Sequence, residues 1–231
     1  MKTHHLNGFT YFLIALLIFG LLGLEFGVFF ITNLVDGQAP LVLDWPANWY
    51  ALLVHWSVTI LIWLSGAYFT YRWARGRGVW EKLMRFNVAR REWYLAAAGI
   101  IMAIAMGMFQ SQQAGLTFPQ VWREFRGFQA LYGRPAWILS IFQNLYYLVE
   151  FTLVVLLLAF FQRAGERWFK ADWFPWGSIG LLSTWGSIHL VTNPQGAVSV
   201  LVWSLILGIF FILMRKSFYP TLLIGFMGFI F

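Results

Sequence analysis

Long apolar runs constrain this chain more than any other feature of its sequence. A helix needs about 20 mostly apolar residues to cross the hydrocarbon core of a bilayer. We therefore expect an all-α fold, a polytopic transmembrane bundle of about seven helices that forms a single integral membrane domain over residues 1–231. The expected helices cover residues 9–35, 48–71, 93–110, 137–161, 174–192, 197–214 and 219–231, and the last is short enough to be a partial span.

Composition excludes several classes of protein. Hydrophobic residues make up 60% of the chain and charged residues 11%, whereas a soluble domain has roughly 25% charged residues. The absence of cysteine excludes disulfides, thiolate metal sites and cysteine nucleophiles. The net charge of +7 is carried by short loops between apolar runs, which is typical of topology signals. We expect the lipid bilayer as the partner of this surface, and no nucleic acid.

The basic residues predict an orientation. Of the 16 Lys and Arg, 13 fall on one side of the predicted membrane: Lys2, seven within 72–91, three within 163–170, and two at 215–216. The opposite side receives only Arg123, Arg126 and Arg134. Because Lys and Arg favour cytoplasmic loops, we expect a cytoplasmic N-terminus, in a prokaryotic cell membrane.

Two connecting segments mix aromatic and polar residues. The segment 111–135 is amphipathic, and we expect an interfacial helix on the outer leaflet, with a plain loop packed on the bundle as the alternative. The segment 78–90 has aromatic and basic residues and is expected on the inner leaflet.

Small residues four positions apart predict where helices approach closely. Gly23 and Gly27 form such a pair in the first expected helix, and Ala103 and Gly107 form another in the third. We interpret both pairs as packing positions, with a gating role as the alternative.

Ionisable residues within a membrane are costly and mark candidate functional sites. The predicted spans contain two acids, Glu25 and Glu150, and two histidines, His55 and His189. At 1.5 Å per residue, Glu25, His55 and His189 lie roughly 24–25 Å from the inner face, and Glu150 roughly 18 Å. The polar intramembrane cluster predicted at this height also includes the amides Gln110 and Asn144.

Three kinds of chemistry fit such a cluster. His55, His189, Glu25 and Glu150 are candidate ligands for a divalent metal, and the same groups can activate water or relay protons. The two histidines are also candidate axial ligands for a haem. The alternative is structural, because Glu–His and His–backbone hydrogen bonds join helices within a membrane.

Two motifs in the last 95 or so residues, about 137–231, occur in a recognisable order. Tyr147-Leu148-Val149-Glu150 is followed, one helix later, by Trp185-Gly186-Ser187-Ile188-His189. This order resembles the CPBP family, the CAAX proteases and bacteriocin-processing (Abi) intramembrane proteins. That family has a Glu-Glu-x-x-x-Arg motif, then Phe-x-x-x-His, then a third motif with a further histidine. The resemblance implies catalytic roles for Glu150 and His189, with water activated for peptide cleavage.

The sequence departs from the family pattern at three places. Val149 stands where the other glutamate belongs, Val154 and Val155 stand where the arginine belongs, and residues 222–226 contain no histidine. These departures favour a non-catalytic relative, a pseudoenzyme acting as a scaffold or as a partner subunit of another membrane protein. Such a protein requires no cofactor. The alternatives are a divergent intramembrane endopeptidase dependent on metal or glutamate, and a haem-binding redox or proton- and ion-handling protein.

The predicted orientation can be tested by cysteine labelling, since the chain has no cysteine of its own. A membrane-impermeant thiol reagent added outside intact cells should modify a cysteine introduced near Gly115 and spare one introduced near Gly78. Both should react after the membrane is permeabilised. The reverse pattern in intact cells would contradict the orientation.

Overall fold

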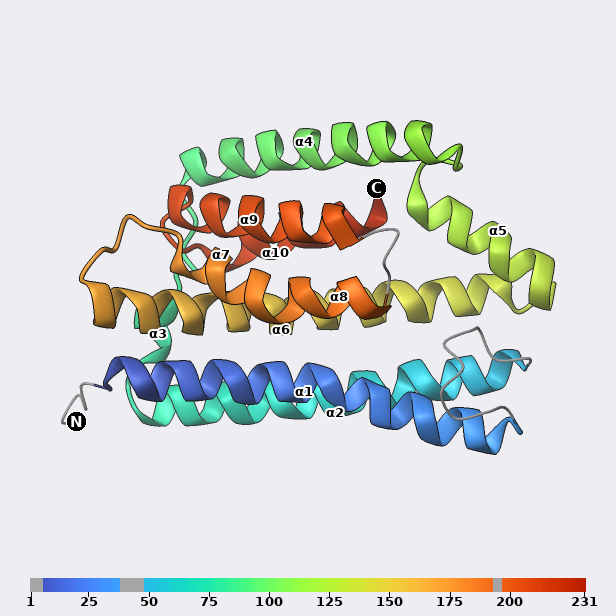
Figure 1. Cartoon of the computed structure of the whole chain (residues 1–231), viewed down its shortest axis with the longest axis horizontal. Coiled ribbons are helices and arrows are strands. Elements are labelled where there is room, and N and C mark those ends of the chain that lie inside the picture. The colour runs from blue at the N-terminus through green and yellow to red at the C-terminus, as the bar shows by residue number, and fades with distance from the viewer. Residues whose placement is uncertain (1–5, 38–47, 193–196) are drawn as a thin grey trace.

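The chain folds as a bundle of helices that run roughly side by side along the long axis of the molecule (Figure 1). The computed structural model describes residues 6–37, 48–192 and 197–231. Within these residues there is no strand, and a single isolated bridge joins Arg85 to Ser217. The helices are α1 (Gly8–Val35), α2 (Trp49–Gly76), α3 (Trp80–Leu83), α4 (Arg90–Ala114), α5 (Gln120–Tyr132), α6 (Ala136–Phe169), α7 (Trp176–Leu181), the π-helical turn η1 (Leu182–Gly186), α8 (Ser187–Thr192), α9 (Ala197–Leu213) and α10 (Phe218–Ile230).

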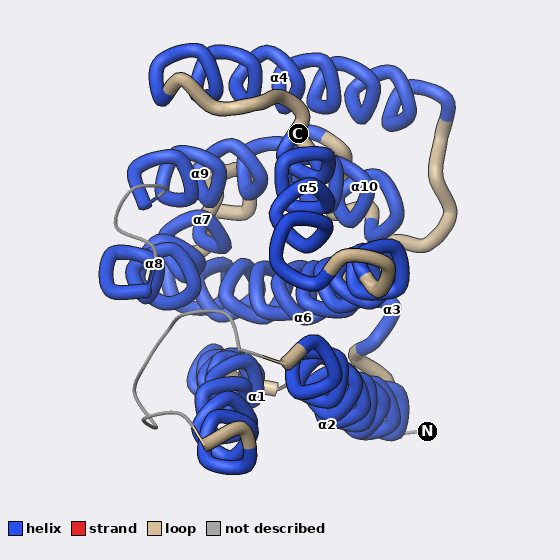
Figure 2. Tube along the Cα trace, turned by 90° about the vertical axis from the view of Figure 1, so that its right-hand side faces the viewer, coloured by secondary structure: helices blue, strands red, loops and turns tan. Residues whose placement is uncertain are grey.

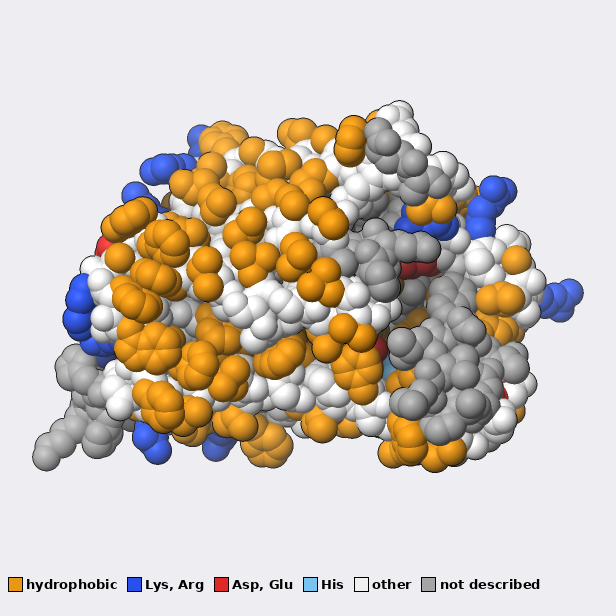
Figure 3. All heavy atoms as spheres, in the orientation of Figure 1, with side chains coloured by type: hydrophobic (Ala, Val, Ile, Leu, Met, Phe, Trp, Pro, Cys, Tyr) orange, Lys and Arg blue, Asp and Glu red, His pale blue; other side chains and the backbone are white. Residues whose placement is uncertain are grey.

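Four helices, α1, α2, α4 and α6, are long and apolar enough to cross a membrane by length and composition. The continuous run α7–η1–α8 and the helices α9 and α10 are shorter. Figure 3 shows hydrophobic side chains over the middle of the molecule and Lys and Arg side chains toward its two ends. Apolar side chains such as Leu17 and Ile101 are each 68% exposed, which suits a surface surrounded by lipid. The expected all-α membrane bundle is confirmed, and the chain is an integral membrane protein.

Helix α6 is the centre of the bundle. In its most apolar stretch 67% of the residues are buried, compared with 22% in α1 and in α4. It contacts α1 and α2 on one side and α5, α7 and α10 on the other, as the end view shows (Figure 2). Helix α4 lies outermost and packs on α9 and α10. A polar residue on α6 can therefore reach either half of the molecule.

Helix α6 continues beyond Phe161, where the apolar run predicted its end. Its 34 residues span roughly 51 Å, well beyond the roughly 30 Å of a hydrocarbon core. Ion pairs hold the added turns in place. The Glu166 carboxylate lies 2.7 Å from Arg163 Nη1 and 2.5 Å from Lys216 Nζ. The amide of Gln162 accepts from Gly177 N and donates to Phe174 O, each at 3.0 Å, which fixes the start of α7.

The two amphipathic segments fold differently from each other. The outer one contains the end of α4, then the helix α5, so the alternative of a plain loop is wrong. The inner one contains only the single turn α3, where Val79, Leu83 and Met84 are buried. Arg85 then bonds Glu92 at 3.0 Å, which anchors this segment to the start of α4.

The glycines that allow close helix approach are mostly not those predicted. A Cβ on Gly23 or Gly27 would meet nothing within 4 Å, so these two positions do not face a neighbouring helix closely. Gly107 does, because its Cβ would lie 2.3 Å from Phe231 O. The tightest contact between α7 and α9 is at Gly208, where a Cβ would lie 2.0 Å from Ser178 Oγ and 2.8 Å from Ser178 N. The spacing of two residues along a helix predicts that they share a face, but it does not predict which neighbouring helix that face contacts.

We expect Gly208→Ala to destabilise the bundle by about 1–3 kcal/mol, because the added methyl overlaps the backbone of α7. The matched control is Gly27→Ala, another glycine inside an apolar helix, which should be neutral or stabilising because alanine favours helix. Thermal unfolding in detergent measures both. Equal effects of the two substitutions would contradict the close approach of α7 and α9.

Candidate functional site

The first part of the site joins α1, α2 and α6. Glu25, on α1, accepts a hydrogen bond from Tyr146 Oη of α6, with 2.5 Å between the oxygens. His55 Nε2 of α2 lies 3.5 Å from the same carboxylate oxygen. His55 is only 3% exposed, and its ring meets Phe29 edge-on at 5.3 Å between centroids. A carboxylate within the bundle is thus held by partners on two other helices.

The second part joins α6 to the π-helical turn. Trp185 Nε1 donates to Glu150 Oε1 at 2.9 Å, and both side chains are buried. His189 Nδ1 donates to the Trp185 carbonyl oxygen at 2.7 Å. This bond places the proton on Nδ1 and leaves Nε2 as an acceptor. Single π turns within helices often occur at functional sites, and here the turn carries the residue that bonds both Glu150 and His189.

These groups surround one cavity of about 490 Å³, which we call the Glu150 cavity. Its polar lining includes Glu25, Tyr146, Glu150, Trp185 and His189, beside Tyr147 and Thr192, and much of the remainder is aromatic, including Phe19, Phe26, Phe29 and Phe229. The lining residues come from α1 and, at Trp63, from α2 on one side, and from α6, η1, α8 and α10 on the other. Its volume is within the roughly 300–1,000 Å³ of small-molecule sites. The structure therefore brings together Glu25, Glu150 and His189 as the sequence predicted.

The other predicted members of the cluster lie elsewhere. His55 is not among the residues lining the Glu150 cavity, and reaches it only through Glu25. Asn144 donates to Ser140 O at 2.7 Å and lines a separate hollow with Leu148 and Phe226. Sequence spacing predicts the position of a residue along its helix axis, but not the direction in which its side chain points. Six residues along an α-helix change the direction of the side chain by about 120°. Asn144, six residues before Glu150 on α6, therefore points in another direction and lies about 9 Å from Glu150 along the helix axis.

Gln110 lines a second cavity of about 260 Å³, which we call the Glu124 cavity. Tyr147, His189 and Phe229 line both cavities and form the wall between them. Tyr147 Oη and Gln120 Nε2 both donate to Glu124 Oε1, at 3.0 and 2.9 Å. Burial raises the pKa of the Glu124 carboxyl above its usual range.

Sequence reasoning missed the residues that hold the charged groups. Tyr146 is four residues before Glu150, and Trp185 is four residues before His189, so each pair shares one helix face. This four-residue spacing was the sequence feature that could have identified Tyr146 and Trp185 as partners of the charged groups. Glu124 was missed because its segment was interpreted as lying on the lipid surface.

The donor groups do not form a metal site or a two-histidine haem site in the part of the chain that the structure describes. No group of three or more His, Asp or Glu side chains there is placed to hold a metal ion. His55 and His189 do not line a common cavity, and His55 Nε2 already faces Glu25. The geometry fits hydrogen bonding between helices better than metal or haem ligation.

No protein-family model, curated protein or solved structure matches this chain.

We expect Tyr146→Phe to destabilise the bundle by about 1–3 kcal/mol, because it removes the hydroxyl that donates to Glu25 and leaves the ring in place. The matched control is Tyr50→Phe on α2, where the ring is 53% exposed, and it should change little. Unfolding in detergent measures both variants. A Tyr146→Phe protein as stable as the control would show that this bond contributes nothing to the fold.

Proposed function

We propose that this chain is a multi-pass membrane protein that acts as a scaffold or partner subunit, a non-catalytic relative of the CPBP intramembrane proteins. One observation carries the proposal. Each ionisable side chain predicted for the site is bonded to another part of the fold: Glu25 to Tyr146 and His55, Glu150 to Trp185, and His189 to the Trp185 carbonyl. Side chains bonded to neighbouring helices in this way hold the helices together.

These bonds support the proposal by their placement. They join α1 to α6, α1 to α2, and α6 to the π-helical turn. Hydrogen bonds between membrane helices contribute on the order of 0.6–2 kcal/mol each. Two such hydrogen bonds, with the 3.5 Å contact between His55 and Glu25 beside them, fix the central helix against both halves of the bundle.

Water activation needs a base and a second polar group that both reach the same water. Here Trp185 separates the two candidates: its indole binds Glu150 and its carbonyl binds His189. No hydrogen bond joins Glu150 directly to His189 among the described residues. With Val149 and Val154 in place of a second acid and an arginine, the family's catalytic set is reduced to one glutamate and one histidine.

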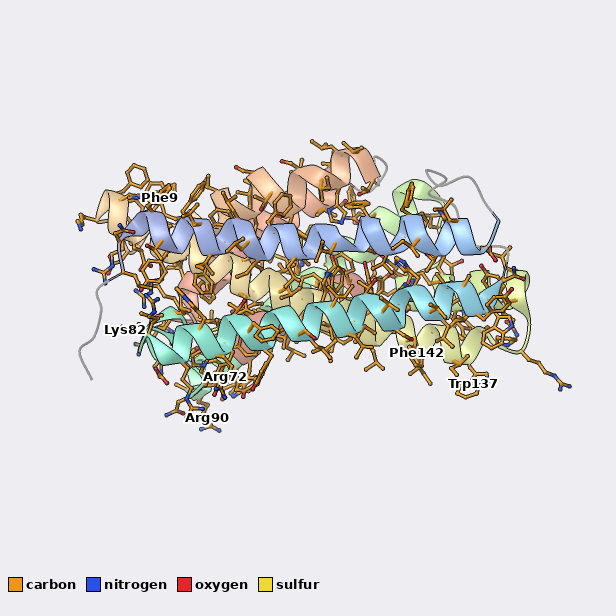
Figure 4. All side chains as sticks on the ribbon, turned by 90° about the horizontal axis from the view of Figure 1, so that it is seen from below. Phe9, Arg72, Lys82, Arg90, Trp137 and Phe142 are labelled. Atoms are coloured by element: carbon orange, nitrogen blue, oxygen red, sulfur yellow. The ribbon has the colours of Figure 1, made fainter. Side chains whose placement is uncertain are left out.

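The proposal includes an orientation. Figure 4 shows Phe9 at the same end of the bundle as Lys82 and Arg90, while Trp137 lies toward the other end. We place the Lys82 end in the cytoplasm of a prokaryotic cell, because cytoplasmic loops accumulate Lys and Arg. The bilayer, and a second membrane protein in contact with the apolar outer surface, are the partners of this role, with no part for nucleic acid.

A divergent intramembrane endopeptidase is the second candidate. The specific observation in its favour is that Glu25, Glu150 and His189 line one cavity large enough for a peptide side chain and water. A hydrolase of this kind would use Glu150 as the base and His189 Nε2 as a second polar group lining the same cavity.

Two substitutions separate these functions. Glu150→Gln keeps an oxygen acceptor for Trp185 and should cost less than about 1 kcal/mol of stability. His189→Ala removes the bond to Trp185 O and the ring packed 4.9 Å from the Trp185 ring, so it should cost about 1–3 kcal/mol. Stability in detergent is measured beside cleavage of membrane-spanning peptides, with Glu81→Gln on α3 as the control.

The scaffold role predicts this order of stabilities and no peptide cleavage by any of the proteins. The endopeptidase predicts cleavage by the natural protein that is lost in Glu150→Gln at unchanged stability. That second result would overturn the proposal.

A further inference from the structure

The Glu124 cavity lies at the other side of the Tyr147–His189–Phe229 wall from the Glu150 cavity and takes no part in the proposed function. Its lining comes from α4, α5, α9 and α10, together with Tyr147 of α6 and His189 of α8. Helix α5 is the amphipathic helix near one end of the bundle (Figure 1), where an amphipathic helix meets lipid head groups. At about 260 Å³ the cavity is smaller than most drug-sized sites, and suits a head group or a small polar molecule.

Two buried polar atoms of the cavity lining have no hydrogen-bond partner among the described residues. Glu124 Oε1 accepts from Tyr147 and Gln120, whereas Oε2 is buried and unpaired. Trp203 is 6% exposed and its Nε1 is likewise unpaired. Buried polar groups without partners are costly and rare in native proteins. The lining of the cavity thus includes a buried acceptor, Glu124 Oε2, and a buried donor, Trp203 Nε1, that have no partner among the described residues.

The two arginines of α5 make other contacts. Arg123 donates to Thr117 O at 3.3 Å, and the Arg126 guanidinium lies 5.6 Å from the centre of the Trp122 ring. Neither is among the residues lining the cavity. Arg123 acts on the Glu124 carboxyl through its charge, but no Lys or Arg of the described residues lines the cavity or bonds Glu124 Oε2.

The chemistry of the lining selects the ligand. A carboxylate oxygen with no partner binds an N–H donor, and most strongly a charged one. The aromatic rings of Tyr147, Trp203 and Phe229 line the same cavity and favour a cation. An indole N–H can only donate, so Trp203 requires an acceptor oxygen on the ligand. A quaternary ammonium has no N–H and would leave Glu124 Oε2 unpaired.

We propose that the Glu124 cavity binds a primary ammonium group that carries an oxygen acceptor a few atoms away. A phosphatidylethanolamine head group and free phosphoethanolamine share this chemistry. Glu124 Oε2 accepts from the ammonium, Trp203 Nε1 donates to the phosphate oxygen, and Gln120 and Tyr147 hold the carboxylate in place.

The test uses the full chain in phosphatidylcholine nanodiscs. Retention of phosphatidylethanolamine is measured by native mass spectrometry, and binding of soluble phosphoethanolamine and phosphocholine by calorimetry. We expect the ethanolamine forms to bind at least about tenfold more tightly than the choline forms, as expected for a hydrogen bond to a charged group. Binding of the lipid alone identifies a head-group site, and binding of both forms identifies a site open to free amines.

Variants locate the interaction. Glu124→Gln keeps the acceptor for Tyr147 and should weaken binding about tenfold or more. Trp203→Phe replaces the indole by a smaller aromatic ring and removes the unpaired N–H, so it should weaken binding of phosphoethanolamine about fivefold and that of ethanolamine little. Glu81→Gln is the matched control for loss of a carboxylate outside the cavity, and should bind as the natural protein does.

Either of two results would overturn the proposal. One is equal affinity for ethanolamine and choline forms in the natural protein, which needs no variant and does not depend on how a variant folds. The other is unchanged binding in folded Glu124→Gln. Neither result bears on the scaffold role, which is tested by Glu150, His189 and peptide cleavage.

Discussion

The hydrogen bond from Tyr146 to Glu25 joins the α1–α2 pair to the rest of the molecule. Inside a bilayer no bulk water is available to a carboxylate, so its partners must come from other helices. Tyr146 supplies one from α6 and His55 another from α2. Four residues further along α6, Glu150 is bonded to Trp185 of the opposite half. Helix α6 thus provides a hydrogen-bond partner for the Glu25 carboxylate on one side and for the Trp185 indole on the other.

The two cavities differ in how completely their polar groups are bonded. In the Glu150 cavity each of the three ionisable groups has a protein partner, which suits a structural role. In the Glu124 cavity a carboxylate oxygen and an indole N–H are buried without partners among the described residues. Because unpaired buried polar groups are destabilising, the second cavity is the better candidate for binding an outside molecule. Tyr147 and His189 touch both, so a ligand in one can alter the packing of the other.

Sequence predicted the helices well and the site partly, for different physical reasons. Hydropathy is a local property, and the expected span 9–35 became α1 (Gly8–Val35) almost without change. Height along a helix is also local, so Glu25, Glu150 and His189 were correctly predicted to be near one another. Direction around a helix depends on which neighbours pack there. Asn144 and the Gly23–Gly27 pair were misassigned for that reason.

The sequence by itself determined that this chain crosses a membrane, because apolar runs of this length leave no soluble alternative and helices satisfy their own backbone. It also placed Glu25, Glu150, His55 and His189 within the apolar helices, although it did not place Glu124 inside the bundle. Only the tertiary structure decided their partners. Trp185, in the π-helical turn, is bonded to two of these groups: its indole donates to Glu150 and its carbonyl accepts from His189. Glu124 faces a cavity because α5 packs on α6, a contact between helices that no local pattern contains.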